Sequence, residues 1–197
     1  VIGESSPDWP FHRYLSVEMQ LDYRHLWVRS LKMQAMMKVK ASLLEGAREF
    51  LKKEGFWEVT PPIFVSSACE GGSTLFEVPY FKMKAYLSQS AQLYLEALIY
   101  SLEKVWSLTP SFRAEKSRTR KHLTEYWHLE LEAAWIGHKE NMEIQEKLVK
   151  AMISRVLDDR QKELEIFDRD IKELEFWMEE KWPTITYDEA IEMIKSK

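Results

Sequence analysis

Two stretches of alternation constrain the fold of this chain more than any other feature. In residues 105–115 and again in 126–135, most apolar side chains occupy one parity and most polar side chains the other. Because successive side chains of a strand point to opposite faces, each stretch predicts a β-strand. The ten residues between them are polar and basic, as in a long hairpin loop. We expect an antiparallel pair with helices on its apolar side, where Trp127, Leu129 and Leu131 are buried, and a polar cleft on the other.

Helical periodicity and turn chemistry predict most of the remaining elements. Apolar residues step by three or four through 30–54, which predicts a long amphipathic helix with Gly55 as its C′ residue. Thr186 and Glu189 form a capping box, so a further helix is expected to begin at Thr186. The other expected elements are extended segments at 56–60 and 63–67, a hairpin over 76–80 and 85–88, and helices at 90–102, 138–163 and onward to Trp182.

The composition excludes several classes of protein. No apolar run approaches the roughly 18 residues of a membrane span, and residues 1–10 lack the basic start and apolar stretch of a signal peptide. Residues 1–20, with many turn-forming residues, are expected to be a linker or arm. The single cysteine, Cys69, excludes a disulfide framework and favours a cytoplasmic location. A net charge of -4 argues against a general nucleic-acid coat protein, and no histidine or cysteine spacing indicates a metal site.

The polar parity of the two strands carries the candidate chemistry. An arginine fixed on a sheet beside a basic loop suits a triphosphate, since a guanidinium can clamp phosphate oxygens. An aromatic ring there could stack on a base, and carboxylates would accept from an ammonium or amide group. The same residues would also fit a ladder of salt bridges on a face exposed to solvent. The basic segment between the strands would then be an ordinary exposed loop. The residues concerned are Arg113 and Glu115 on the first strand, and Tyr126, His128, Glu130 and Glu132 on the second.

Five segments, in order along the chain, resemble those of class II aminoacyl-tRNA synthetases of the aspartyl/asparaginyl group. Residues 112–115 (FRAE) and 119–126 (TRKHLTEY) resemble motif 2 of that group, and residues 55–61 (GFWEVTP) resemble motif 1. The other three matches are the segment that opens the catalytic domain at 21–24 (LDYR), the mobile loop at 70–72 (EGG) and the amino-acid-binding segment at 89–94 (QSAQLY).

This resemblance implies an α+β fold, the class II antiparallel sheet flanked by helices, incomplete at its C-terminal side. Residues 21–197 would be the N-terminal portion of the catalytic domain, with motifs 1 and 2. Motif 3, an anticodon-binding OB-fold and the glutamates that bind Mg²⁺ are expected outside this sequence. The implied activity is activation of an amino acid by ATP and its transfer to tRNA, in a homodimer formed through motif 1.

The family's functional residues are carried over position by position. Arg113 would be the catalytic residue, holding the α-phosphate and the substrate carboxylate. The implied ATP-binding residues are Arg113, Ala114, Glu115, Lys121, His122, Leu123 and Tyr126. The implied amino-acid-binding residues are Glu70, Gln92, Arg113 and Glu130.

Two positions indicate which amino acid would be the substrate. Aspartyl enzymes usually carry lysine where Leu95 stands, and asparaginyl enzymes carry glutamate where Glu130 stands. The chain therefore resembles the asparaginyl branch of archaeal type, with asparagine and tRNA(Asn) as substrates, and Leu95→Lys with Glu130→Asp is expected to favour aspartate. The alternatives are an aspartyl-type or asparagine-synthetase-type paralogue of the same fold, or a truncated dimerisation module without catalysis.

Overall fold

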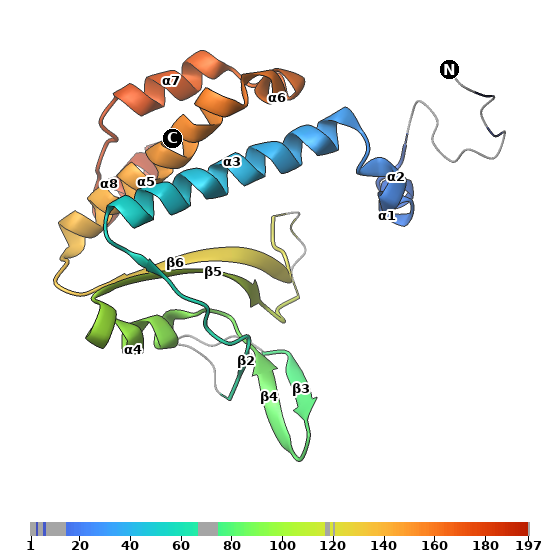
Figure 1. The fold of residues 1–197 in the computed structure, drawn as a ribbon. Helices are drawn as coiled ribbons and strands as arrows, with labels where there is room; N and C mark the ends of the chain where they lie inside the picture. Colours follow the sequence, from blue (N-terminus) through green and yellow to red (C-terminus); the bar gives the residue numbers. More distant parts are fainter. Residues whose placement is uncertain are drawn as a thin grey trace. The chain divides into compact units, whose positions relative to one another are not determined.

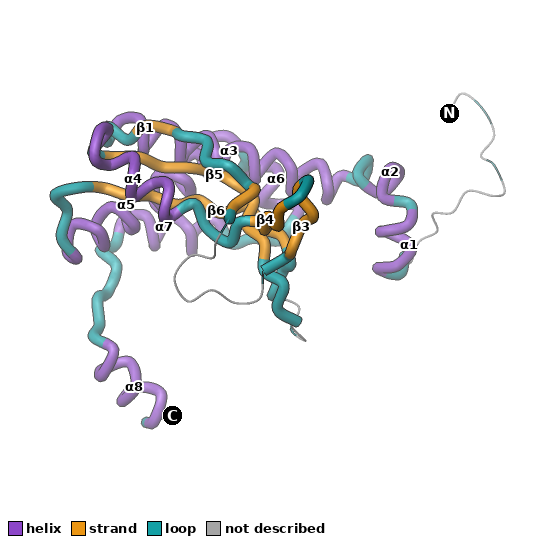
Figure 2. The backbone as a smooth tube through the Cα atoms, turned by 90° about the horizontal axis from the view of Figure 1, so that it is seen from below, coloured by secondary structure: helices purple, strands orange, loops and turns teal. Residues whose placement is uncertain are grey.

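The computed structural model describes residues 3, 6, 15–66, 75–116, 119 and 121–196. It divides into two compact units, one made of Val1–Ala47 with Glu146–Lys197 and the other of Arg48–Gln145. Figures 1 and 2 show the elements of both units. Every helix within the described ranges is too short or too polar to cross a lipid bilayer.

Among its described residues, the second unit contains two small sheets, one complete helix, the end of α3 (Leu31–Lys53) and the start of α5 (His138–Asp159). Strand β5 (Lys104–Phe112) pairs antiparallel with β6 (Glu125–Ala133), as the alternation predicts. The short strand β1 (Trp57–Glu58) pairs parallel with β5 on its other edge, giving the order β1-β5-β6. The second sheet has the order β2-β4-β3, all antiparallel, and confirms the predicted hairpin (Figure 1). Its strands are β2 (Phe64–Val65), β3 (Glu77–Tyr80) and β4 (Met83–Leu87).

The polar face of β5 and β6 is not the open cleft that the sequence predicts, because helix α4 (Gln92–Leu102) packs on it. Val105 lies on the polar parity but is apolar, and it forms a buried cluster with Ala91 and Leu95. This cluster attaches α4 at the end of the face where β5 begins. The opposite face is also less buried than expected. Trp127 is 56% exposed, and Leu129 and Leu131 are only half-buried.

Helix α3 (Leu31–Lys53) ends in a Schellman motif at the predicted glycine. The backbone N–H of Phe56 donates to the carbonyl of Leu51 at 2.9 Å, and that of Gly55 donates to Lys52 at 3.2 Å. Gly55 has φ +83°, a conformation that favours a residue without a Cβ. Phe56 and Leu51 are both buried, so the turn is fixed by an apolar contact as well as by hydrogen bonds. This end of the helix directs the chain into β1.

The first unit is helical. Besides most of α3, it contains α1 (Val17–Asp22), α2 (Arg24–Trp27), most of α5 (His138–Asp159), α6 (Gln161–Ile166), α7 (Ile171–Glu179) and α8 (Tyr187–Lys195). The capping box that begins α8 is present as predicted, with both the Thr186 and Glu189 bonds formed. Helix α1, capped by Ser16, was not predicted, and the predicted helix 138–163 is interrupted at Arg160.

Close approach of α3 and α5 depends on Gly46. A Cβ at this position would lie 2.8 Å from the carbonyl oxygen of Ala151 and 2.9 Å from Cβ of Arg155. Both contacts are shorter than side chains tolerate, and the first is with backbone. Around this crossing, Arg160 donates from Nε to the buried Ser42 hydroxyl at 2.9 Å.

We expect Gly46→Ala to lower the free energy of unfolding. Alanine should gain about 1 kcal/mol of helix propensity, but overpacking against a backbone carbonyl costs about 1–3 kcal/mol. Urea unfolding measures the balance, with Lys40→Ala, at an exposed site of the same helix, as the control. A more stable Gly46→Ala variant would contradict this packing of α3 on α5.

Candidate active site

The residues of the polar face lie in register across β5 and β6. Ser111 pairs with Tyr126, Thr109 with His128 and Ser107 with Glu130, so these side chains share one face of the sheet. The guanidinium carbon of Arg113 lies 5.8 Å from the centre of the Tyr126 ring, a cation–π distance. The backbone N–H of Arg113 donates to the carbonyl of Thr124 at 2.9 Å, which continues the ladder past β5. One end of the face thus carries a cation beside an aromatic ring.

At the other end of the face, Glu130 is held by the start of α4. The hydroxyl of Ser90 donates to Oε1 of Glu130, and the backbone N–H of Ala91 donates to Oε2 at 2.9 Å. The N-cap residue of α4 makes no side-chain capping bond of its own. Glu130 therefore supplies from the sheet the acceptor and negative charge that a helix N-terminus requires.

Two further carboxyl groups lie near Glu130. Gln92 donates from Nε2 to Oε1 of Glu96 at 2.8 Å. Burial, followed by the negative charges of Glu96 and Glu130, raises the pKa of Glu132 above its ordinary value. The surroundings of Glu130 are therefore acidic and partly dehydrated, which favours a ligand group that donates hydrogen bonds.

His128 lies between the two ends of the face. Its Nδ1 is 3.2 Å from the hydroxyl oxygen of Ser111 and 3.4 Å from Oε2 of Glu130. Its ring centre is 5.4 Å from that of Tyr126. Alternation in the sequence predicts that His128 lies on this face, but it indicates no role for His128 or for Ser90. Alternation could locate the histidine, but nothing local in the sequence indicated that Ser90 would meet Glu130.

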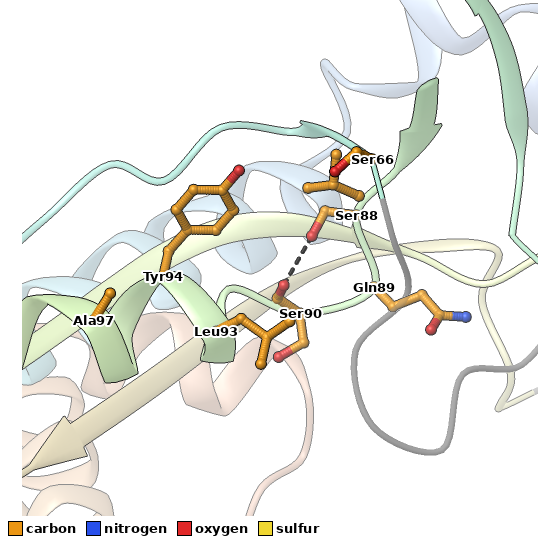
Figure 3. A pocket seen from close by; sticks show the side chains of 8 residues that line it. Ser66, Ser88, Gln89, Ser90, Leu93, Tyr94 and Ala97 are labelled. Atoms are coloured by element: carbon orange, nitrogen blue, oxygen red, sulfur yellow. Dashed lines mark hydrogen bonds between the residues drawn. The ribbon is translucent and has the colours of Figure 1, made fainter. Parts of the chain in front are cut away.

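A pocket of about 260 Å³ borders the start of α4 (Figure 3). Leu93, Tyr94 and Ala97 line it from the side of α4 opposite the buried Leu95. Ser90 belongs both to this pocket and to the Glu130 contacts, and its carbonyl accepts from the Ser88 hydroxyl at 2.8 Å. The other lining residues are Val65, Ser66 and Gln89.

The structure brings together part of the predicted set. Arg113, Tyr126 and Glu130 lie on one face, and Gln92 contacts Glu96 beside it. Ala114 is half-buried next to Arg113, whereas Glu115, Lys121, His122 and Leu123 are exposed. The imidazole of His122 pairs with the hydroxyl of Thr119. Glu70 lies outside the described residues, as does Cys69. The described residues form no group of three or more potential metal ligands.

Leu95, which stands where aspartyl enzymes usually carry lysine, lies in the core. It is 0% exposed and packs in the cluster with Ala91 and Val105. A lysine there would bring a charge into an apolar cluster. Loss of stability is therefore the first effect to expect from the Leu95→Lys exchange, ahead of any change in amino-acid preference.

Comparison with known proteins gives consistent matches. Residues 16–197 match the family model of class II tRNA synthetases (D, K and N). The asparagine--tRNA ligase of Pyrococcus abyssi is 59% identical over 182 residues, which cover 92% of this chain and 42% of that protein. The chain thus spans less than half the length of such relatives.

Solved structures agree with these sequence matches. The asparaginyl-tRNA synthetase of Pyrococcus horikoshii, complexed with asparaginyl-adenylate, is 58% identical with a TM-score of 0.88, covering 92% of this chain and 42% of that one. The Entamoeba histolytica asparaginyl-tRNA synthetase in complex with asparaginyl-adenylate is 31% identical with a TM-score of 0.81, covering 100% and 43%. The α+β fold with antiparallel sheets expected from the sequence is that of these structures.

The raised pKa of Glu132 predicts a pH-dependent effect of Glu132→Gln on stability. At pH 7 the carboxylate is ionised in both states, and burial beside Glu96 and Glu130 makes that charge costly only in the folded one. As the pH falls through the raised folded pKa, the folded protein binds the proton first and the cost disappears. Glu132→Gln should therefore raise the free energy of unfolding at pH 7, and its advantage should narrow toward pH 4.5.

Urea unfolding between pH 7 and pH 4.5 tests this expectation. Glu125→Gln is the matched control, because Glu125 is exposed on the other face of the same strand. A Glu132→Gln variant that is less stable than the parent at pH 7, or whose advantage does not change with pH, would contradict the assigned environment.

Proposed function

This chain belongs to the family of class II tRNA synthetases (D, K and N), and we propose that it is the first part of the catalytic domain of an asparagine--tRNA ligase. The complete protein would activate asparagine with ATP and transfer it to tRNA(Asn). Relatives of that name are 46% to 59% identical to the chain. The single observation that carries the choice of amino acid is the acidic surrounding of Glu130.

The charge of this pocket favours an amide over a carboxylate. Burial, and then the negative charges of Glu96 and Glu130, raise the pKa of Glu132, so a further negative charge beside Glu132 is unfavourable. An aspartate side chain would add another negative charge, whereas the NH2 of asparagine donates hydrogen bonds. The position where aspartyl enzymes carry lysine is the buried Leu95, so it offers no compensating cation.

ATP would bind at the Arg113 end of the face. Tyr126 would stack on the adenine ring while Arg113 holds the α-phosphate and the substrate carboxylate. We assign Ala114, Glu115, Lys121, His122 and Leu123 to the remaining nucleotide contacts. The amino-acid contacts would come from Gln92, Glu130 and Glu70. These roles follow from the family resemblance and from the arrangement of the described residues among them.

The reaction needs no nucleophile from the protein. An oxygen of the asparagine carboxylate attacks the α-phosphorus of ATP, and the bond to the β-phosphate oxygen breaks with release of pyrophosphate. A tRNA ribose hydroxyl then attacks the activated carbonyl, loses its proton, and AMP leaves. Arg113 would stabilise the charge that develops at the α-phosphate in the first step.

We propose Mg²⁺ as the ion that accompanies ATP, because it would neutralise the charge of the phosphates. The described residues do not fit a metal site, since they form no cluster of three or more potential ligands. A cytoplasmic location is likewise part of the proposal, and the single cysteine supports it.

We further propose that the protein is a two-fold dimer formed through motif 1. Two features of β1 support this interface: it is an edge strand of its sheet, and its Trp57 side chain is 63% exposed. Light scattering of the complete gene product should give the mass of a dimer. Trp57→Glu should weaken association at least about tenfold, because it places a charge in an apolar contact.

The matched control for the dimer is Tyr100→Glu. Tyr100 is an aromatic residue of α4 with 93% exposure, outside motif 1. A folded parent that stays monomeric at high concentration, or equal effects of the two variants, would exclude dimerisation through this strand.

Amino-acid-dependent exchange of pyrophosphate into ATP tests the proposed activity. The complete gene product should exchange with asparagine and far more slowly with aspartate. Glu130→Ala should reduce kcat/KM for asparagine about tenfold to several-hundredfold, because an amide donor left without its acceptor costs about 1–3 kcal/mol, and more when that acceptor is charged. The KM for ATP should change much less.

Glu175→Ala, at an exposed glutamate of α7, is the control for this experiment. Because Glu130 also accepts from Ala91, the melting temperature of each variant is measured in parallel. Asparagine activation unchanged by Glu130→Ala would remove Glu130 from the role of discriminator.

A further inference from the structure

His128 is the described residue that contacts both halves of the polar face. On one side its ring lies 5.4 Å from Tyr126, over which Arg113 is placed. On the other side its Nδ1 lies 3.4 Å from Oε2 of Glu130. The imidazole is about one-third exposed and the Glu130 carboxylate only 12%, so this contact is partly shielded from water.

The neighbours of Nδ1 determine which nitrogen of His128 carries the proton. The two groups nearest to it are the Ser111 hydroxyl, which can donate or accept, and the Glu130 carboxylate, which only accepts. A proton on Nδ1 can be donated to the Ser111 oxygen and lies beside the negative charge of Glu130, 3.4 Å from Nδ1. A proton on Nε2 alone would direct the Nδ1 lone pair toward a carboxylate in a partly dehydrated site, which is unfavourable.

Glu130 also has a second set of contacts to preserve. Its two oxygens accept from Ser90 and from the backbone N–H of Ala91, both fixed at the start of α4. These contacts hold the carboxylate on the helix side, and an Nδ1–H donor on the strand side opposes rotation away from it. The charged groups around His128 are Glu130, with Glu132 and Glu96 beyond it, and Arg113 across Tyr126.

We propose that His128, protonated at Nδ1, is a positioning residue that fixes the Glu130 carboxylate for the amino-acid substrate. The proposal rests on the function proposed above, because it is in that reaction that Glu130 meets the asparagine amide. We assign His128 no contact with a reacting atom. It acts through Glu130, so its loss should affect the amino acid more than the nucleotide, although it lies beside the ring assigned to adenine.

A pair of substitutions separates the hydrogen bond from the mere presence of a polar side chain. The amide of His128→Asn ends at the distance of Nδ1 from the backbone, whereas the amide of His128→Gln ends at that of Nε2. Pyrophosphate exchange by the complete gene product should show KM for asparagine within about threefold of the parent for His128→Asn and raised about tenfold for His128→Gln. KM for ATP should stay within about threefold in both.

The inference is overturned if the two variants behave alike, or if KM for ATP rises as much as KM for asparagine. Equal drops in melting temperature with equal losses of activity would likewise assign His128 a structural role only. If the parent activates a different amino acid, the proposed function fails, and the same KM comparison is made with that amino acid.

A second measurement does not depend on activity. Long-range ¹H–¹⁵N NMR spectra of the imidazole rings report which nitrogen is protonated, and the His128 signals are assigned from their loss in His128→Asn. We expect a proton on Nδ1 of His128. A neutral ring protonated only on Nε2 would contradict the proposal whatever the substrate is.

Discussion

The contact between the Glu130 carboxylate and the start of α4 is the interaction on which the rest of the candidate site depends. A helix placed on a sheet needs an apolar contact to hold it and a partner for its first N–H groups. Leu95 provides the first by packing on Val105, and Glu130 provides the second through Ala91. The start of α4 is thus attached both by apolar packing and by a charge. These contacts hold the Glu130 carboxylate, which we assign as the hydrogen-bond acceptor for the substrate amide.

The same arrangement explains why an acidic site can be stable. Burial, followed by the negative charges of Glu96 on α4 and Glu130 on β6, raises the pKa of Glu132, so an ionised Glu132 is costly in this site. Glu130 offsets part of its share by accepting from Ser90 and Ala91, and Glu96 by accepting from Gln92. A substrate that donates hydrogen bonds to these carboxylates would relieve the electrostatic cost that remains. The folding free energy that these carboxylates cost without substrate can therefore contribute to selectivity for an amide over a carboxylate when substrate is bound.

Local patterns in the sequence predicted what local interactions determine. Alternation predicted β5, β6 and their antiparallel pairing, Gly55 predicted the end of α3, and the capping box predicted the start of α8. The matched family and the asparaginyl relatives confirm the resemblance carried by motifs 1 and 2.

The structure differs from the predictions where segments that are distant in the sequence meet. The position of α4 on the polar face depends on one apolar residue, Val105, within a polar parity. The parallel pairing of β1 involves too few residues to leave a periodic signal. Exposure of Trp127 and burial of Leu95 likewise depend on which segment packs where, which no single stretch of sequence contains. The contacts of His128 and Ser90 with Glu130 belong to this second class.

The most direct test of the account is a crystal structure of the complete gene product with a non-hydrolysable analogue of asparaginyl-adenylate. We expect the side-chain amide nitrogen of the ligand at hydrogen-bond distance, about 3 Å, from a carboxylate oxygen of Glu130. Glu130 should still accept from Ala91 at the start of α4. A complex in which Glu130 contacts only Ser90 and Ala91, with the amide held by other groups, would contradict the central claim.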